Sequence, residues 1–324
     1  MASLHIARRA FTAALAFAPA VLLAQAKWNM PTAYAENNFH TQNIKQFASE
    51  VRDATKGRID INVHSGASLY KLPEIKRAVQ GGQVPIGEIL LSNHGNEDAL
   101  FEADMIPFLA AGFDRSWQLY TVQKPLLQDK LGKQGMRMLY SVAWPGNGIF
   151  RKTPMDSLAA FKGAKFRAYN RITARFAEEL GAQPTTIQAA ELAQAFTMNM
   201  ATTMIASPQI GVDTKAWEFL TSFYDTNAMH PRNAVLVNER EFAKLSPENQ
   251  QAILKVSAQA EARGWDMARA AAKASTDTLA KNGLKVYEPS PAMKADFERV
   301  SQVLIQEWSK RAGPDGDRIV KAMK

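Results

Sequence analysis

The chain has 324 residues, of which 46% are hydrophobic and 22% charged, and 39 Lys and Arg outnumber 31 Asp and Glu, for a formal net charge of +8. This length is too great for one simple core and predicts a soluble globular protein of two domains. The basic residues are scattered and accompany no nucleic-acid-binding motif, so we expect no nucleic-acid partner. Because the chain has no cysteine, disulfides and a cysteine-linked lipid anchor are excluded.

The first 26 residues differ from the rest of the chain. Arg8 and Arg9 precede an uncharged, mostly apolar run over 10–23, and Ala24-Gln25-Ala26 has the small-x-small pattern of a cleavage site. The apolar run is too short for a membrane span. We therefore predict a signal peptide over 1–26, cleaved near Ala26, and a free periplasmic protein. General export and twin-arginine export both fit the paired arginines.

Five times along the chain, a predicted helix ends at a glycine and an extended segment follows. Glycine supplies the left-handed residue that ends a helix and releases the chain into a strand. The predicted helices cover 43–55, 74–80, 125–133, 172–180 and 275–281, and the extended segments cover 58–63, 84–91, 136–142, 185–188 and 284–287. This alternation predicts an α/β fold with largely parallel sheets.

A long helix is predicted after Ser246-Pro247-Glu248, which combines a capping residue, a proline and an acidic residue. No strong break follows before Gly283, so about 35 residues could run for roughly 50 Å, with a kink allowed at Gly264. A helix of that length is expected to cross two domains, and the buried strand predicted over 233–238 would return the chain between them. The predicted ranges are 27–144 plus 232–272 for domain I and 145–231 plus 273–324 for domain II. A further helix is predicted over 292–310.

The residues of known catalytic and metal sites do not occur here in their usual arrangements. No two histidines are three or four residues apart, and there is no phosphate-binding glycine loop, nucleophile elbow or dinucleotide motif. His94 and the acidic residues after it read as a polar loop, and Asp315-Gly316-Asp317 reads as a turn. We therefore expect no catalytic residue, metal or cofactor. An exported α/β enzyme acting on a carboxylate is the alternative, and an exported scaffold without a ligand is a third interpretation.

Arg167 is the leading candidate for ligand binding. It lies in a short predicted strand between Phe166 and Ala168, whose side chains point to the opposite face. A guanidinium stays charged and offers a planar fork of donors that fits a carboxylate. The local pattern also fits a surface arginine, or one that pairs with Glu178 or Glu179.

Several segments together resemble the periplasmic solute-binding proteins of tripartite ATP-independent periplasmic (TRAP) transporters, of the DctP type. The segments are 38–44, 57–59, 81–87, 104–109, 158–167 and 179–184 with Glu191. The resemblance implies a two-domain periplasmic binding protein fold with crossing strands and a long helix spanning both domains. It also implies that Arg167 binds a carboxylate, that the ligand lies between the domains, and that the partners are TRAP membrane permease subunits. We expect a monomer.

Other candidate ligand contacts follow strand ends or turns predicted to face the cleft. They are Asn147, Trp144, Asn93, Ser92, Tyr34, Phe39 and Ser207. Packing is the alternative for Trp144, Tyr34 and Phe39, and helix capping is the alternative for Ser207. Some members of the resembled family carry a second arginine where this chain has Asn147, which indicates a small organic monocarboxylate. The acid could be an aromatic 2-keto or 2-hydroxy acid, or a short aliphatic hydroxy or keto acid.

Overall fold

The computed structural model describes residues 25–324, and most of the predicted signal peptide, residues 1–24, lies outside the described residues. The strands of this described part form three sheets. Among these residues, no helix is both long enough and apolar enough to cross a membrane.

Two of the sheets lie in the half of the molecule that holds the N-terminal strand. β1 (Ala26–Pro31) pairs in parallel with β2 (Ile59–His64). The second sheet has the order β3-β10-β4, with bounds β3 (Ile86–Leu90), β10 (Arg232–Asn238) and β4 (Met136–Ala143). Every residue of β10 is buried, which confirms the buried strand predicted over 233–238.

The third sheet is mixed and lies in the other half. Its order is β11-β9-β5-β8-β6-β7. The bounds are β11 (Lys285–Tyr287), β9 (Ser222–Tyr224), β5 (Gly148–Arg151), β8 (Thr203–Ala206), β6 (Lys165–Ala168) and β7 (Gln183–Thr186).

The expectation of largely parallel sheets is wrong at β5 and β10. Each of these strands is antiparallel to both of its neighbours. The chain crosses between the halves from β4 to β5 and returns from β9 to β10, so the two crossing paths run in opposite directions. β10 is therefore antiparallel to β4, and β5 is antiparallel to β9. Neither crossing segment contains a helix, which a parallel connection would require.

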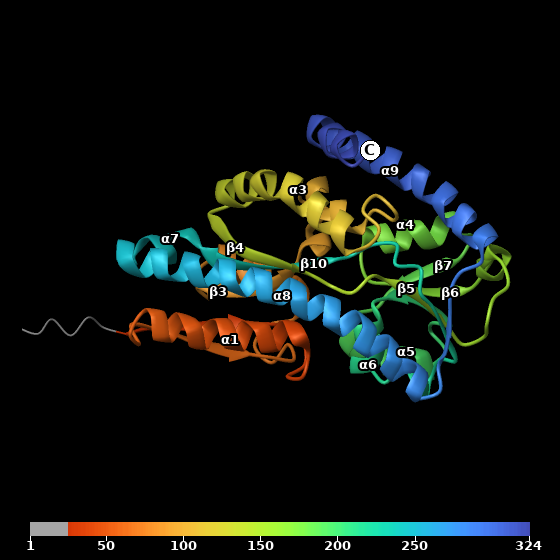
Figure 1. The fold of residues 1–324 in the computed structure, drawn as a ribbon, viewed down its shortest axis with the longest axis horizontal. Helices are drawn as coiled ribbons and strands as arrows, with labels where there is room; N and C mark the ends of the chain where they lie inside the picture. Colours follow the sequence, from red (N-terminus) through yellow and green to blue (C-terminus); the bar gives the residue numbers. More distant parts are fainter. Residues whose placement is uncertain (1–24) are drawn as a thin grey trace, which may run out of the picture.

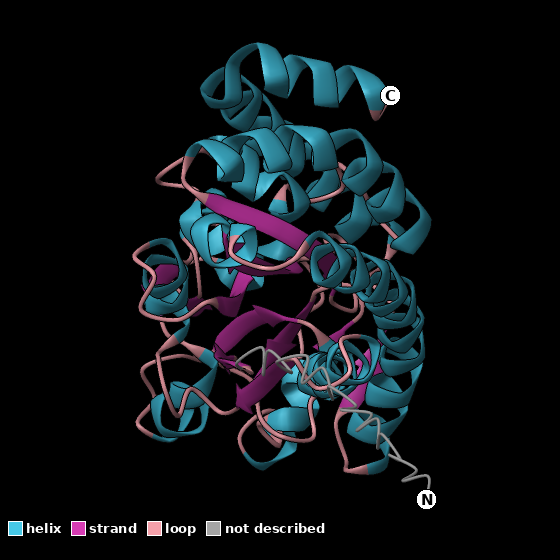
Figure 2. Cartoon of the chain, turned by 90° about the vertical axis from the view of Figure 1, so that its left-hand side faces the viewer, coloured by secondary structure: helices cyan, strands magenta, loops and turns pink. Residues whose placement is uncertain are grey.

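Helices cover both faces of the sheets (Figures 1 and 2). The α-helices are α1 (Phe39–Ala54), α2 (Leu72–Gln80), α3 (Phe113–Lys133), α4 (Arg171–Glu179), α5 (Leu192–Thr197), α6 (Pro208–Asp213), α7 (Glu239–Ala243), α8 (Pro247–Lys281) and α9 (Pro291–Ala322). The short 3-10 helices are η1 (Leu91–His94), η2 (Ala99–Met105), η3 (Leu158–Phe161), η4 (Ala189–Glu191) and η5 (Ala216–Glu218). All five predicted helix ends are confirmed, with positive φ at Gly57, Gly82, Gly135, Gly181 and Gly283.

The long helix α8 runs without interruption across both halves (Figure 1). It packs against α1 and β4 on one side of the crossing and against α6 and β11 on the other. No kink occurs at Gly264, which is buried where the helix crosses β4 and α1. A Cβ there would lie 2.4 Å from a methyl group of Val142 and 2.7 Å from the amide nitrogen of Asn43. The glycine therefore permits close packing rather than bending.

The last helix, α9, packs against α4 of one half and against η2 and α3 of the other. Its buried Trp308 donates a hydrogen bond from Nε1 to the carbonyl oxygen of Ala99, 2.7 Å away. The turn predicted at Asp315-Gly316-Asp317 is wrong, because this segment is helical. The break comes earlier, at Gly313 (φ 62°), and Pro314 then restarts the helix in the first-turn position that suits proline.

Candidate functional site

A cavity with an empty volume of about 450 Å³, which includes space open to solvent, lies between the two halves. It is lined by Tyr34, Leu72, Leu90, Trp144, Asn147, Arg167, Tyr169, Gln188, Ala189, Ala206, Ser207, Ile210 and Pro231. Five of the predicted residues are therefore brought together: Tyr34, Trp144, Asn147, Arg167 and Ser207. The lining is mostly apolar, and Arg167 is its one formally charged side chain in the part of the chain that the structure describes.

Arg167 lies on β6 and is only 3% exposed. Its Nε donates to the carbonyl oxygen of Ile187 at 2.8 Å, and Nη1 donates to that of Ile205 at 3.2 Å. None of the carboxylates of residues 25–324 lies within ion-pair distance of it; Glu178 and Glu179 pair with Arg175 instead, so the surface-pair alternative is wrong. Burial lowers the pKa of Arg167 to about 10, so it still carries its charge at neutral pH.

A buried cation without an anion is costly, and two neutral carbonyl oxygens compensate only part of that cost. A ligand carboxylate in the cavity would supply the missing charge in a bidentate geometry that suits a guanidinium. Arg167 therefore has the burial and the free charge required of a carboxylate-binding residue.

Tyr169 lies under the Arg167 guanidinium, whose central carbon is 4.7 Å from the ring centre. The Tyr169 hydroxyl accepts a hydrogen bond of 2.6 Å from Nδ2 of Asn147, and burial raises the pKa of Tyr169. The sequence prediction missed Tyr169. The alternation of side chains along a strand could have found it, because it follows Arg167 by two residues and shares its face.

Asn147 is held rigidly in the chain segment that crosses from β4 to β5. Its backbone nitrogen donates to the carbonyl oxygen of Met229 at 2.9 Å, and its own carbonyl oxygen accepts from Thr226 Oγ1 at 2.8 Å. With Nδ2 bound to Tyr169, its Oδ1 has no donor among residues 25–324. Asn147 therefore offers the cavity a hydrogen-bond acceptor and no second positive charge.

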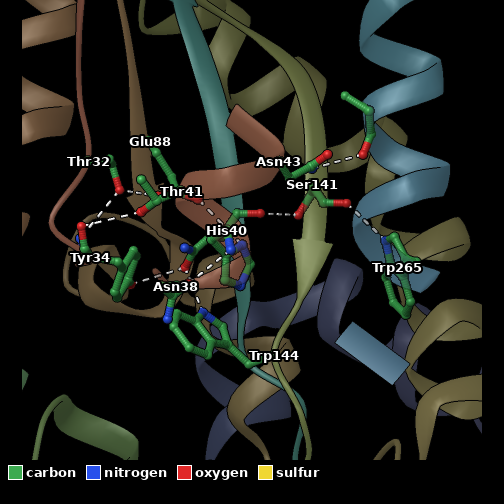
Figure 3. Close-up of polar contacts among 12 residues, drawn as sticks. Thr32, Tyr34, Asn38, His40, Thr41, Asn43, Glu88, Ser141, Trp144 and Trp265 are labelled. Atoms are coloured by element: carbon green, nitrogen blue, oxygen red, sulfur yellow. Dashed lines mark hydrogen bonds and ion pairs between the residues drawn. The ribbon is translucent and has the colours of Figure 1, made fainter. Parts of the chain in front are cut away.

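Trp144 and Tyr34 line the cavity from the half with the N-terminal strand and together form an aromatic wall. Figure 3 shows the two side chains. Their rings meet edge to face at 4.8 Å. Phe39 is not among the lining residues; it packs behind the wall, with its ring centre 5.5 Å from that of Trp144. Phe39 is therefore a packing residue and not a ligand contact in this structure, because helix α1 starts at Phe39 and directs its ring toward the core.

A buried polar group lies behind this wall. Glu88 Oε2 accepts a hydrogen bond of 2.5 Å from the Thr32 hydroxyl, and Nδ1 of His40 lies 3.5 Å from Glu88 Oε1. Burial raises the pKa of Glu88 to about 7 and lowers that of His40 well below its ordinary value. His40 is therefore neutral at physiological pH and adds no positive charge to the wall.

The remaining predicted residues lie at the edge of the site. Ser207 lines the cavity and also caps α6, since its Oγ accepts from the backbone nitrogen of Ile210 at 3.3 Å. Ser92 and Asn93 line a second, more polar cavity, which shares Tyr169 and Gln188 with the first. Ser92 and Asn93 therefore do not line the Arg167 cavity, although the two cavities share lining residues.

Side-chain hydrogen bonds join the two halves at several points. Asn38 Nδ2 donates to Asp213 Oδ2 at 2.6 Å, and Asn170 Nδ2 donates to Ser92 Oγ at 3.0 Å. In each pair one residue comes from the half with the N-terminal strand and the other from the half with the six-stranded sheet. The molecule is therefore in a conformation in which the two halves are closed over the cavity.

The polar loop after His94 is held by internal pairs. Lys76 binds Glu97, and His94 Nδ1 lies 3.2 Å from Glu97 Oε1. Among residues 25–324, no group of three or more His, Asp or Glu side chains is arranged to hold a metal ion.

Comparison with known proteins relates the chain to solute receptors. A family model described as bacterial extracellular solute-binding protein, family 7 (DctP), matches residues 31–311. DctP6 and DctP7 of Bordetella pertussis, extracytoplasmic solute receptors that bind pyroglutamic acid, are 47% and 43% identical, and each alignment covers 92% of this chain and 99% of theirs, with TM-scores of 0.90. A marine metagenome TRAP solute-binding protein specific for pyroglutamate is 38% identical, with coverages of 93% and 99% and a TM-score of 0.90. A solute-binding protein of Albidiferax ferrireducens is 25% identical over 161 residues, and the match spans about half of its length, 47%.

Proposed function

The chain belongs to family 7 of the bacterial extracellular solute-binding proteins, the DctP family, and is a TRAP substrate-binding receptor; from that premise we propose that its ligand is pyroglutamate. Receptors of this kind work with membrane permeases. We infer that this one is exported, is cleaved near Ala26, and delivers the acid to TRAP permease subunits as a monomer. Its mechanism is then binding, closure and release, without catalysis.

The observation that carries the ligand assignment is the unpaired buried guanidinium of Arg167 in a cavity with otherwise uncharged walls. Pyroglutamate has one carboxylate, which matches one arginine. Its five-membered lactam ring suits the apolar surface of Trp144 and Tyr34, and the ring N–H requires an acceptor such as Asn147 Oδ1. Receptors 47% and 43% identical to this chain bind the same acid, which supports the proposal.

The same lining disfavours other acids. A dicarboxylate would place a second charge against neutral side chains, at a high desolvation cost. The keto acids suggested by the sequence have no N–H or O–H beside the carboxylate, so they would leave the Asn147 oxygen without a donor. A short hydroxy acid has a hydroxyl donor, but it has no ring to cover the apolar surface of Trp144 and Tyr34. We therefore expect pyroglutamate to bind more tightly than lactate, pyruvate, phenylpyruvate or glutamate.

Isothermal titration calorimetry of the mature chain with L-pyroglutamate and these four acids tests the proposal. Arg167→Ala should weaken pyroglutamate binding by a hundredfold or more, about 3 kcal/mol, because the carboxylate would be desolvated without its partner. Arg58→Ala is the matched control, because it removes an arginine outside the cavity. Arg58 Nη1 lies 3.4 Å from Glu248 Oε2 at the surface. No measurable pyroglutamate binding to the wild-type chain, or an unchanged affinity in Arg167→Ala, would refute the proposal.

Incubation separates this receptor from the exported enzyme considered as the alternative. Pyroglutamate recovered after hours with equimolar protein should have an unchanged mass and chirality. Conversion of the acid would instead favour the enzyme. If no acid stabilises the wild-type chain in a thermal-shift screen, the result would favour the third interpretation, an exported scaffold without a ligand.

A further inference from the structure

Asn233 lies behind the aromatic wall and is itself absent from the cavity lining. It is 2% exposed and belongs to β10, the strand by which the chain returns between the halves. Its Oδ1 accepts two hydrogen bonds, from the hydroxyl of Tyr34 at 3.2 Å and from Nε1 of Trp144 at 3.0 Å. One buried oxygen thus connects the polar groups of both rings.

The two rings reach this oxygen from different parts of the fold. Tyr34 follows β1, Trp144 follows β4, and 110 residues separate them along the chain (144 − 34). The second side-chain torsion of each ring has broad energy minima, so rotamer preference alone leaves the tilt of the ring weakly determined. A shared acceptor removes that freedom for both rings at once, and their edge-to-face contact at 4.8 Å couples them further.

Asn233 is well suited to serve as a fixed reference point. Its backbone pairs with Leu90 of β3 and Val142 of β4, and its carbonyl oxygen accepts a hydrogen bond of 2.7 Å from Ser141 Oγ. A residue held by strands on both sides cannot follow small movements of the wall. The position of the wall relative to Arg167 is therefore defined from β10.

We propose that Asn233 is a positioning residue that determines which ring size the cavity accepts. By orienting Trp144 and Tyr34 together, it holds the space in front of Arg167 at the width of a five-membered lactam acid and rejects a six-membered one. This inference rests on pyroglutamate being the ligand. Asn233 acts through the two aromatic residues and does not touch the acid.

Calorimetry with L-pyroglutamate and its six-membered homologue, 6-oxopiperidine-2-carboxylate, tests the inference. Asn233→Ala should raise the Kd for pyroglutamate about tenfold, the usual effect of one lost buried hydrogen-bonding group. The affinity for the six-membered homologue should fall by less than this, or rise. The Kd for the homologue divided by the Kd for pyroglutamate should therefore fall at least several-fold. Urea denaturation of each variant establishes that the chain is folded under the conditions of the titration.

A double-mutant cycle separates positioning from direct contact. Tyr34→Phe and Trp144→Phe each remove one donor to Asn233 without altering β10, so they remain informative if Asn233→Ala does not fold. Each should lower the ratio of Kd values in the wild-type background, and Tyr34→Phe should have no further effect in the Asn233→Ala background. The coupling is the result that a general loss of stability would not produce.

Two outcomes overturn the inference. If Tyr34→Phe weakens binding equally in both backgrounds, the hydroxyl contacts the acid directly and Asn233 does not act through it. If the variants weaken both acids by the same factor, Asn233 has no role in ring-size selection. Failure of the wild-type chain to bind pyroglutamate is a different result, which refutes the proposed ligand before any variant is measured.

Discussion

The side-chain amide of Asn38 donates a hydrogen bond of 2.6 Å to the carboxylate of Asp213, and this bond joins the start of α1 to the end of α6. The other oxygen of Asp213 accepts from Gln209 Nε2 at 2.7 Å, and Gln209 in turn accepts from Ser275 of α8 at 2.9 Å. The carboxylate is thus held in place by α6 and α8. Because Asn38 belongs to the other half of the molecule, the bond can form only when the halves are closed.

Asp213→Ala should therefore weaken pyroglutamate binding about five- to tenfold, without loss of the Arg167 contact. A hydrogen bond made only in the closed conformation stabilises that conformation by about 1–1.5 kcal/mol, and the ligand affinity depends on the population of the closed conformation. Calorimetry gives the affinity, and small-angle scattering with and without ligand gives the degree of closure. Asp277→Ala removes a surface pair with Lys273 and is the matched control. An unchanged Kd in Asp213→Ala would show that the bond does not contribute to closure.

Arg167→Lys should bind pyroglutamate at least tenfold more weakly than the wild-type chain but more tightly than Arg167→Ala. Lysine keeps the positive charge, but it lacks the planar fork and cannot bind the Ile187 and Ile205 carbonyl oxygens in the same way. Calorimetry on the three proteins under identical conditions checks this order. Equal affinities of the lysine variant and the wild-type chain would mean that charge alone is recognised.

The stability of the chain should depend on pH through Glu88. Its pKa is raised by burial from an ordinary value of 4.5 to about 7, so between these pH values the folded chain binds this proton more tightly than the unfolded chain. The stabilisation is present in full below pH 4.5 and is lost as the pH rises through 7, on the order of 3 kcal/mol in total. Burial lowers the pKa of His40 well below its ordinary value, so His40 is neutral near pH 7.

Glu88→Gln should remove this dependence, because glutamine has a similar shape and no charge. The difference in free energy of unfolding between the variant and the wild-type chain should therefore shift in favour of the variant as the pH rises from 4.5 to 8. Urea titrations at several pH values measure the difference and cancel the contribution of all other groups. A difference that is constant with pH would contradict the raised pKa of Glu88.

Gly264→Ala should destabilise the fold by about 2–3 kcal/mol, because the new Cβ would overlap the side chains of Val142 and Asn43. Gly132→Ala is the matched control. Gly132 lies in α3, and a Cβ there meets no atom within 4 Å, so the same substitution should stabilise by about 0.5–1 kcal/mol. Urea denaturation compares the two. Similar effects of both substitutions would mean that the helix α8 can move away from β4 at little cost.

Many features of this protein follow from the sequence because their causes are local. At the five predicted helix ends a glycine adopts a left-handed conformation that other residues avoid, so these helix ends could be predicted from the sequence alone. Ser246 and Pro247 likewise start α8 by capping chemistry within one turn. Arg167 was the leading candidate because a guanidinium in a short strand fits a carboxylate and because the segment around it resembles that of the TRAP solute-binding proteins.

Tertiary structure decided the features whose causes lie between distant segments. The acceptor shared by Tyr34 and Trp144 belongs to Asn233, which is 199 residues away from Tyr34. The role of Gly264 depends on the approach of β4 and α1, and the directions of β5 and β10 depend on how the chain crosses between the halves. Local propensity determines where an element begins and ends, but it contains no information about which side chains will be desolvated together. That is why the sequence predicts an arginine for the carboxylate, while only the folded chain defines the cavity around it.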